Sequence, residues 1–314
     1  MNKNFRGKDF LTLMDFTREE IQAMLNVSYD LKKKWAAGEP HEYLKGKIFA
    51  ALFEKPSTRT RNSFQVGAIH LGAQAVYIRP DELQLSRGES LRDTARVLDR
   101  YYDGLFIRPA SGTGQEEINL FAEYMDIPVI NACSDFTHPC QGLADLLTIQ
   151  EKKGDLKGLK VAWSGDPWNV CHSLMVGCGL MGMDMYLAFP EGYDPHPEIL
   201  KFATEAAEAS KTKMVVTRNL TEALEGADVV VANVFFSMAH DAEKEKRKKD
   251  FAPYQINAES VSAAKDDYIF MHCGPGYPGV EATEEIFEGP HSAYYDEAEN
   301  RMHTEKAVLA LCCS

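Results

Sequence analysis

The chain lacks any stretch that would place it in or across a membrane. No run of about 18 apolar residues occurs in its 314 residues, so no transmembrane span is expected. Residues 1–8 lack the apolar core of a signal peptide, which favours a cytoplasmic location. Positive charge is also scarce. The formal net charge is −13, whereas nucleic acid and anionic membranes both require a basic surface. We expect neither as a partner, and any anion site must be local.

The cysteine spacing argues against two further classes of protein. None of the seven cysteines belongs to a Cys-x-x-Cys pair, so neither a disulfide framework nor a structural zinc site is expected. Most should be small buried hydrophobes. No metal and no cofactor are predicted. The basic run at residues 244–249 lies between acidic residues, which favours a solvated loop or helix face over a nucleic-acid patch.

The chain does contain a regular alternation of helical patterns and short apolar runs. Strands are predicted at residues 48–53, 75–78, 104–108 and 127–132, and a second series at residues 160–164, 184–189, 213–217, 228–233 and 268–272. Such alternation is typical of α/β proteins with parallel sheets. We expect two doubly wound parallel-sheet domains, residues 1–148 and 149–292, with the active site in the cleft between them. Residues 293–314 should form a C-terminal helix that returns to the first domain.

The most informative stretch is Glu-Lys-Pro-Ser-Thr-Arg-Thr-Arg at residues 54–61. It follows a predicted strand and precedes a helical pattern, so its hydroxyl groups lie where a strand leads into a helix. The first turn of a helix has free backbone N–H groups and a partial positive charge. Two arginines and three hydroxyls at such a turn favour an oxyanion site, since arginine binds phosphate with a planar fork. The alternative is a capped helix start with solvated arginines.

Other polar residues also follow predicted strands. Those at or just past a strand end are Arg108, His138, Gln141, Asn169, Asn233 and Cys273. Ligands of parallel α/β domains bind at the carboxyl ends of the strands. The shared placement of these residues therefore predicts one cleft.

In chain order these motifs resemble those of the aspartate/ornithine carbamoyltransferase family, and most of all its ornithine branch. The resemblance covers nearly the whole chain. It rests on Ser-Thr-Arg-Thr-Arg at residues 57–61, the segment at residues 85–98, His-Pro-Cys-Gln at 138–141, Ser-Met at 237–238, His-Cys-Gly-Pro at 272–275 and Asp-Glu-Ala-Glu-Asn-Arg at 296–301. The aspartate branch is disfavoured because it has Pro-Leu-Pro where this chain has His-Cys-Gly-Pro.

The resemblance implies transfer of a carbamoyl group from carbamoyl phosphate to an amine acceptor, ornithine or an ornithine-like compound. The first domain would bind carbamoyl phosphate and the second the amine. The implied phosphate ligands are Ser57, Thr58, Arg59, Thr60 and Arg108. The residues implied to face the carbonyl oxygen are His138, Arg301 and Thr60, while Gln141 would face the carbamoyl NH2 group. The implied catalytic residues are Arg59, Arg108, His138, Gln141, Cys273 and Arg301.

Further residues are implied in substrate binding and assembly. Cys273 and Gly274 would line the carbamoyl phosphate site, and the Gly274–Pro275 peptide bond would be cis. Gln84 matches a position that reaches into the neighbouring subunit's site, which implies a homotrimer with shared active sites. The residues implied to bind the acceptor are Asn169, Asn233, Ser237 and Met238.

The acceptor side departs from the ornithine pattern. Asn233 stands where that branch has the aspartate that binds the substrate's α-ammonium, and a buried ammonium without a counter-charge is costly. Trp168 adds bulk beside Asn169, and Gly274 replaces a leucine. These changes favour a different acceptor, such as putrescine, another diamine or an ω-amino acid. The alternative is drift within a true ornithine enzyme, with water or another carboxylate replacing the aspartate.

The sequence disfavours two other functional classes. A dinucleotide-dependent oxidoreductase is disfavoured, because Gly165-Asp166-Pro167-Trp168 does not give the Gly-x-Gly-x-x-Gly spacing. A non-catalytic family member that only binds carbamoyl phosphate is less favoured, since the phosphate and carbonyl residues are retained. Only an assay excludes it.

Overall fold

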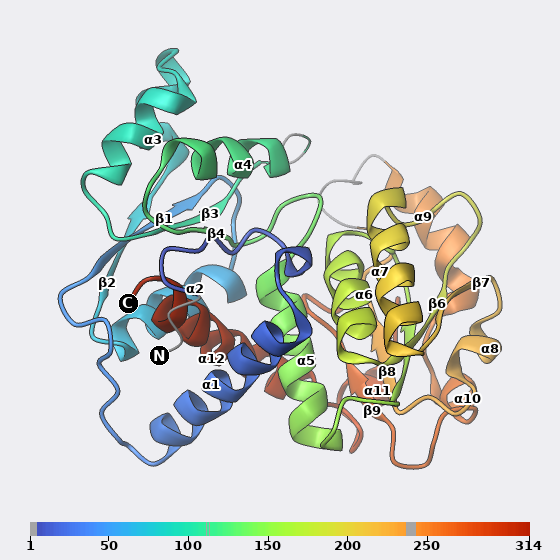
Figure 1. Cartoon of the computed structure of the whole chain (residues 1–314). Helices are drawn as coiled ribbons and strands as arrows, with labels where there is room; N and C mark the ends of the chain where they lie inside the picture. The colour runs from blue at the N-terminus through green and yellow to red at the C-terminus, as the bar shows by residue number, and fades with distance from the viewer. Residues whose placement is uncertain (1–4, 111, 113, 237–242) are drawn as a thin grey trace. The chain divides into compact units, whose positions relative to one another are not determined.

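The structure is a computed structural model that describes residues 5–110, 112, 114–236 and 243–314. The chain divides into two compact units (Figure 1). Unit 1 comprises residues 1–144 and 299–314, and unit 2 comprises residues 145–298. Two helices contribute to both: α5 (Pro139–Lys153) begins in unit 1, and α12 (Tyr294–Cys312) begins in unit 2. The functional division at residues 148 and 292 stays a prediction.

Unit 1 is built on a four-stranded parallel sheet with the order β2-β1-β3-β4. Its strands are β1 (Ile48–Phe53), β2 (Gln74–Ile78), β3 (Leu105–Arg108) and β4 (Val129–Asn131). Its other helices are α1 (Arg18–Ala36), α2 (Arg59–His70), α3 (Leu91–Asp99) and α4 (Gly114–Tyr124). Helix α1 begins with a capping box at Thr17, whose side chain accepts from the Glu20 amide.

Helices cover both faces of this sheet. On one face, Leu98 of α3 and Phe121 of α4 join a core with Leu52 of the central strand β1. On the other face, Phe64 of α2 stacks on Phe106 of β3 with 3.9 Å between ring centroids. Burial on both faces explains why the central strands are continuous apolar runs.

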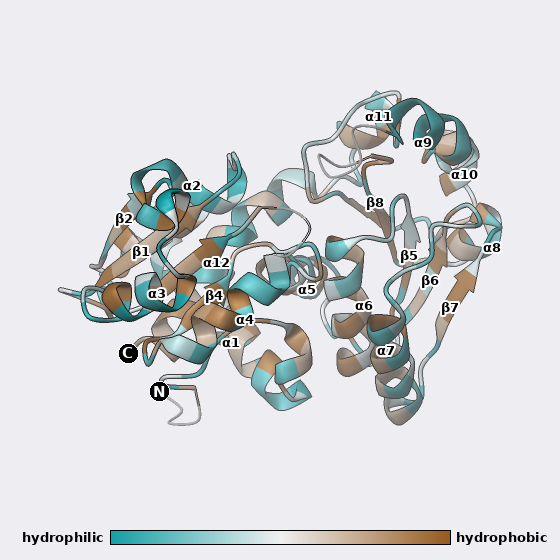
Figure 2. Cartoon of the chain, turned by 90° about the horizontal axis from the view of Figure 1, so that it is seen from above, coloured by the Kyte–Doolittle hydropathy of each residue, from teal (hydrophilic) through white to brown (hydrophobic). Residues whose placement is uncertain are grey.

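Unit 2 is built on a five-stranded parallel sheet with the order β7-β6-β5-β8-β9. Its strands are β5 (Lys160–Ser164), β6 (Asp184–Ala188), β7 (Met214–Thr217), β8 (Val229–Ala232) and β9 (Ile269–Met271). Its helices are α6 (Asn169–Met181), α7 (Pro197–Ser210), α8 (Leu220–Leu224), α9 (Lys244–Phe251), α10 (Ala258–Val261) and α11 (Glu284–Phe287). Helices α6 and α7 lie on one side of the sheet, while α8, α10 and α11 lie on the other (Figures 1 and 2).

The packing of unit 2 follows from this arrangement. Gly179 allows α6 to approach α7 closely, since a Cβ there would lie 2.7 Å from the carbonyl oxygen of Ala203. On the opposite face, Leu224 of α8 and Phe287 of α11 join a core with Phe270 of β9. The strands are mostly brown in the hydropathy view, as expected for strands covered on both sides (Figure 2).

All nine predicted strands are present, each within two residues of its predicted limits, and the α/β class with two parallel sheets is confirmed. All seven cysteines are free thiols, and Cys140, Cys171, Cys178, Cys312 and Cys313 are buried. Within the described ranges, no helix combines the length and the apolar character needed to cross a membrane.

Candidate active site

The carboxyl ends of β1 and β3 bring Ser57 and Arg108 together. The two strands are parallel neighbours with Phe53 opposite Arg108, and the Glu54 amide donates to the Arg108 carbonyl oxygen at 2.9 Å. Past the end of β1, the Ser57 Oγ accepts a hydrogen bond from the Arg108 Nη1 at 3.1 Å. Both side chains are partly exposed, so their remaining donors are accessible to a ligand.

Helix α2 begins within the Ser-Thr-Arg-Thr-Arg motif, three residues earlier than the apolar pattern suggested. Thr58 is the N-cap, yet its side chain makes no capping hydrogen bond. The Thr58 hydroxyl thus accepts no hydrogen bond from the first-turn N–H groups of α2, which can donate to an anion instead. The two arginines separate: Arg59 opens the helix and is half-buried, whereas the Arg61 guanidinium lies over the Tyr77 ring, 4.6 Å from its centroid. Of these two arginines, Arg59 stays a candidate phosphate ligand.

Arg301 of α12 joins three helices of unit 1 through its buried guanidinium. Its Nη1 donates to Gln141 Oε1 at 2.7 Å, at the start of α5. Its Nη2 donates to Thr60 Oγ1 at 3.0 Å, in the first turn of α2, and to Glu305 Oε1 at 3.1 Å. The predicted residues Thr60, Gln141 and Arg301 therefore form one hydrogen-bonded group.

His138 is buried next to this group and is neutral. Its pKa lies well below the ordinary value, chiefly because of burial and further because of the positive charges of Arg301, Arg108 and Arg59. A neutral imidazole carries one N–H donor and one acceptor. It can therefore donate to a carbonyl oxygen without adding a further buried charge.

Asn233 and Cys273, the predicted acceptor-side residues of unit 2, are in contact. Asn233 follows β8, and its Nδ2 donates to the carbonyl oxygen of Asp166 at 3.0 Å. Its Oδ1 accepts from the thiol of Cys273, which follows β9, at 3.5 Å. Gly165 has a φ of +120°, and a Cβ there would lie 2.3 Å from the Asn233 carbonyl oxygen. Glycine is required at this close approach of two strand ends.

The other predicted acceptor-side residues of unit 2 that the structure describes also follow strands of its sheet. Asn169 opens α6 after β5 and is half-buried, and Trp168 before it has its ring centroid 6.2 Å from that of His172. Gly274 has a φ of +68°, and its peptide bond with Pro275 is cis, as predicted. Ser237 and Met238 lie outside the described residues. Gln84 belongs to unit 1, where it is exposed and begins the 3-10 helix Gln84–Arg87.

The sequence reasoning missed a buried ion pair beside Asn233. Arg247 Nη1 lies 3.0 Å from Asp166 Oδ2, and Arg247 Nε donates to Glu243 at 2.9 Å. The basic run at residues 244–249 is helical, but the prediction that it is a solvated face is wrong for Arg247, which is only 7% exposed. The spacing of Glu243 and Arg247, four residues apart with Glu243 as the N-cap residue of α9, was the available signal.

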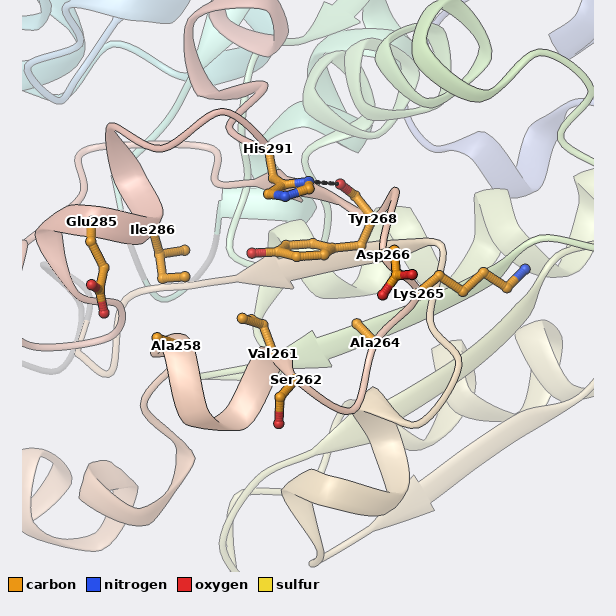
Figure 3. A pocket seen from close by; sticks show the side chains of 10 residues that line it. All are labelled: Ala258, Val261, Ser262, Ala264, Lys265, Asp266, Tyr268, Glu285, Ile286 and His291. Carbon is orange, nitrogen blue, oxygen red and sulfur yellow. Dashed lines mark hydrogen bonds between the residues drawn. The ribbon is translucent and has the colours of Figure 1, made fainter.

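A separate pocket of about 400 Å³ opens in unit 2 near the amino end of β9 (Figure 3). Tyr268 and His291 stack there with ring centroids 4.3 Å apart, and His291 Nδ1 lies 2.8 Å from the Tyr268 carbonyl oxygen. The predicted site residues do not line it. Nor does any group of three His, Cys, Asp or Glu side chains within the described residues suit a metal ion.

Comparison with known proteins settles the family. The carbamoyl-P binding domain of aspartate/ornithine carbamoyltransferases matches residues 8–151, and the Asp/Orn binding domain matches residues 157–312. The chain belongs to the aspartate/ornithine carbamoyltransferase family. The chain is 49% identical over 311 residues to an ornithine carbamoyltransferase of Carboxydothermus hydrogenoformans, covering 99% of both chains. It is 46% identical to that of Pyrococcus horikoshii, covering 98% of this chain and 96% of the relative.

Solved structures of carbamoyltransferases share the fold. The ornithine carbamoyltransferase of Pyrococcus furiosus superposes with a TM-score of 0.94 at 45% identity, over 98% of each chain. The anabolic enzyme of Campylobacter jejuni gives a TM-score of 0.89 at 40% identity, over 96% of this chain and 97% of that one. The names of these carbamoyltransferases leave the acceptor-side changes of this chain untested.

Proposed function

We propose that this protein transfers the carbamoyl group of carbamoyl phosphate to an amine, ornithine or an ornithine-like compound, and releases phosphate. The observation that carries the proposal is the group built around Arg301 in unit 1. It combines a buried guanidinium, the Thr60 hydroxyl, the Gln141 amide and a neutral His138 beside the Arg108–Ser57 pair. Such a set offers donors both to a phosphate dianion and to a carbonyl oxygen.

In this proposal the phosphate is held at the start of α2. Ser57, Thr58, Arg59 and Thr60 contribute hydroxyls, a guanidinium and first-turn N–H groups, and Arg108 contributes a second guanidinium. Charge-assisted hydrogen bonds of this kind are short and about twice as strong as neutral ones. Positive charge near the bridging oxygen also stabilises phosphate as it leaves.

The carbonyl group would face the buried residues. A neutral amine attacks the carbonyl carbon, and the carbonyl oxygen becomes an oxyanion in the tetrahedral intermediate. Arg301, His138 and Thr60 can donate to this oxygen, and no side-chain nucleophile is needed. Gln141 Oε1 accepts from Arg301, but a carbonyl oxygen has a second lone pair, which is available to the carbamoyl NH2 group.

The proposed roles of Cys273 and Gly274 rest on their position in the loop that follows β9. Cys273 donates its thiol hydrogen to Asn233, so the two residues are held together at the carboxyl ends of β8 and β9. The N–H of Gly274 donates to His272 Nδ1 at 2.8 Å, which fixes the loop after β9. With Asn169 and Asn233, this loop is the proposed acceptor-binding region of unit 2.

A second candidate acceptor is favoured by the hydrogen bonds of Asn233. Both ends of its amide are occupied within the protein, and the nearby carboxylate of Asp166 is paired with Arg247. This arrangement offers little counter-charge for an α-ammonium. It favours putrescine, another diamine or an ω-amino acid over ornithine. Drift within an ornithine enzyme is the competing interpretation.

A panel of acceptors distinguishes these candidates. Phosphate release from carbamoyl phosphate should be measured with ornithine, lysine, putrescine, shorter diamino acids and β-alanine, and the ureido products confirmed by mass spectrometry. Turnover of ornithine at ordinary enzyme rates supports the first candidate. Turnover of another amine with ornithine inert supports the second. Carbamoyl phosphate binding without turnover of any amine would favour the non-catalytic alternative.

We also propose a homotrimer with shared active sites. Support comes from exposed apolar residues at the sheet edge of unit 1, where Val76 and Tyr77 of the edge strand β2 are 41% and 37% exposed and Ile69 of α2 is 63% exposed. Unpaired edges and exposed apolar side chains are typical of interfaces. Gln84 would enter the neighbouring site. Mixing inactive Gln84→Ala and Arg301→Ala subunits should restore part of the activity if sites are shared, and none if each subunit works alone.

A further inference from the structure

Glu305 is a buried carboxylate for which neither the reaction scheme nor the family resemblance provides a role. It lies one helical turn after Arg301 on α12 and is 1% exposed. Its Oε1 accepts from Arg301 Nη2 at 3.1 Å, the same nitrogen that donates to Thr60 Oγ1 at 3.0 Å. The carboxylate therefore shares one nitrogen of the Arg301 guanidinium with Thr60, a residue of the proposed carbamoyl phosphate site.

The carboxylate of Glu305 interacts with groups on three helices. Among the described residues, the charged or titratable groups that act on it are Arg301 on its own helix and the buried thiol of Cys140 on α5, and Ser63 of α2 adds a hydroxyl. Burial raises the pKa of Glu305 to about 7, while the charge of Arg301 and hydrogen bonds from Ser63 and Arg301 oppose that rise. Its charge therefore changes close to neutral pH.

We propose that Glu305 is a positioning residue of the carbamoyl phosphate site, which acts through Arg301 by holding its guanidinium toward Thr60 and Gln141. The inference rests on the proposed function, because it assigns Arg301 to the carbonyl oxygen. In its ionised form Glu305 makes a charge-assisted bond to Nη2. On protonation the bond becomes a weaker one between a cation and a neutral acceptor.

The consequence is a loss of orientation at low pH. Among the described residues, the Arg301 guanidinium donates to three side chains, and the two that are assigned to ligand binding, Thr60 and Gln141, are neutral. Glu305 supplies the one charged anchor of this set. When that anchor weakens, the guanidinium is less well held where the oxyanion would form, and misplacement of a stabilising donor lowers the rate steeply.

A purely structural role makes a different prediction. If Glu305 served only to neutralise a buried arginine, its removal would lower the amount of folded protein and reduce activity equally at every pH. Only a positioning role changes the shape of the pH profile and the balance between kcat and KM. The readout must therefore be a pH profile.

The test compares wild type with Glu305→Gln, which keeps an oxygen acceptor for Arg301 and cannot titrate. The matched control is Glu299→Gln on the same helix, whose carboxylate contacts His303 and Lys32 instead. For each protein, kcat/KM for carbamoyl phosphate is measured from pH 6 to pH 8.5 with the best acceptor of the panel. Affinity for carbamoyl phosphate is measured by calorimetry over the same range. Ratios between variants cancel the titration of ligand and amine.

Wild type and Glu299→Gln should lose about threefold in kcat/KM between pH 8 and pH 6 relative to Glu305→Gln, because a carboxyl with a pKa of about 7 is mostly ionised at pH 8 and mostly neutral at pH 6. At pH 8, Glu305→Gln should be about fivefold less active than wild type, the difference between a charged and a neutral acceptor. Glu305→Met, which removes the acceptor, should lose more at every pH. If that variant does not fold, the profile of Glu305→Gln decides alone.

Parallel pH profiles for wild type and Glu305→Gln would overturn the proposal, and so would unchanged kcat/KM in a folded Glu305→Met. Failure of the proposed function looks different. In that case wild type itself shows no affinity for carbamoyl phosphate at any pH.

Discussion

Replacing Asn233 with aspartate restores the carboxylate that the ornithine branch uses for the α-ammonium, and it has two opposite effects. In the free protein the Asn233 Nδ2 donates to the Asp166 carbonyl oxygen at 3.0 Å. In Asn233→Asp a carboxylate oxygen replaces this donor and faces the Asp166 carbonyl oxygen, which is also an acceptor. Water cannot easily relieve this contact, because residue 233 is only 5% exposed. An unsatisfied buried polar group costs about 1–3 kcal/mol, so we expect Asn233→Asp to lose about 2 kcal/mol of stability.

For a domain of this size, that loss corresponds to a fall in Tm of about 4–8 °C. The matched control is Asn219→Asp. Asn219 caps α8 through its Oδ1, which accepts from the Thr221 and Glu222 amides, a role that aspartate fills equally well. Its Tm should equal that of wild type. Saturating ornithine should recover part of the Tm lost in Asn233→Asp, because the bound ammonium supplies the missing donor.

Kinetics provide the second half of the experiment. Pairing the α-ammonium with the carboxylate introduced by Asn233→Asp should raise kcat/KM for ornithine at least tenfold, which corresponds to about 1.4 kcal/mol, and should leave the KM for carbamoyl phosphate unchanged. If the activity toward ornithine does not rise at all, the reasoning about counter-charge is refuted and Asn233 is a case of tolerated drift. An unchanged Tm would show that the bond to Asp166 is not important for stability.

Three further outcomes are expected. Gly165→Ala should lose about 3–5 kcal/mol, read from its denaturation midpoint, since a Cβ would clash with the Asn233 backbone at a positive φ; an unchanged midpoint would contradict this. The folded state raises the pKa of Glu305 from 4.5 to about 7, so it binds that proton more tightly than the unfolded chain does. The free energy of unfolding should therefore fall by about 3 kcal/mol from pH 4.5 to pH 7 in wild type relative to Glu305→Gln, and parallel urea titrations would refute it. His138→Ala should lower kcat about 10²–10³-fold, and because the pKa of His138 is depressed, wild type should show no loss between pH 8 and pH 6 from its protonation. A loss that persists in Glu305→Gln and disappears in His138→Ala would count against that.

Part of the carbamoyl phosphate side was predictable because ligands of parallel sheets bind at the carboxyl ends of the strands. Recognising the strands was enough to place Ser57 and Arg108 at one edge of a sheet, whereas the pairing of β1 with β3, which brings them together, came from the structure. The same reasoning placed Asn233 and Cys273 at strand ends, and the pairing of β8 with β9 in the structure explains why the two side chains are in contact.

Pairings within helices were harder to predict, because spacing alone does not report burial. Arg247 lies in a run of lysines that is typical of a solvated face, yet its guanidinium turns inward to Asp166. Glu305 follows Arg301 by four residues, which is ordinary for an exposed helical pair. Their inward orientation depends on which side of each helix faces the rest of its unit, and the local pattern does not contain that information.

Three arginines surround the neutral His138, yet the chain as a whole has a formal net charge of −13. This contrast between local and overall charge affects the rate at which carbamoyl phosphate binds. A dianion diffusing toward the protein experiences repulsion at long range and attraction only near contact. Dissolved salt screens exposed charges beyond about 8 Å at physiological ionic strength and screens buried pairs much less. Added salt should therefore speed the capture of carbamoyl phosphate and leave its dissociation nearly unchanged. This is the reverse of the salt dependence shown by enzymes whose overall field steers a charged substrate inward.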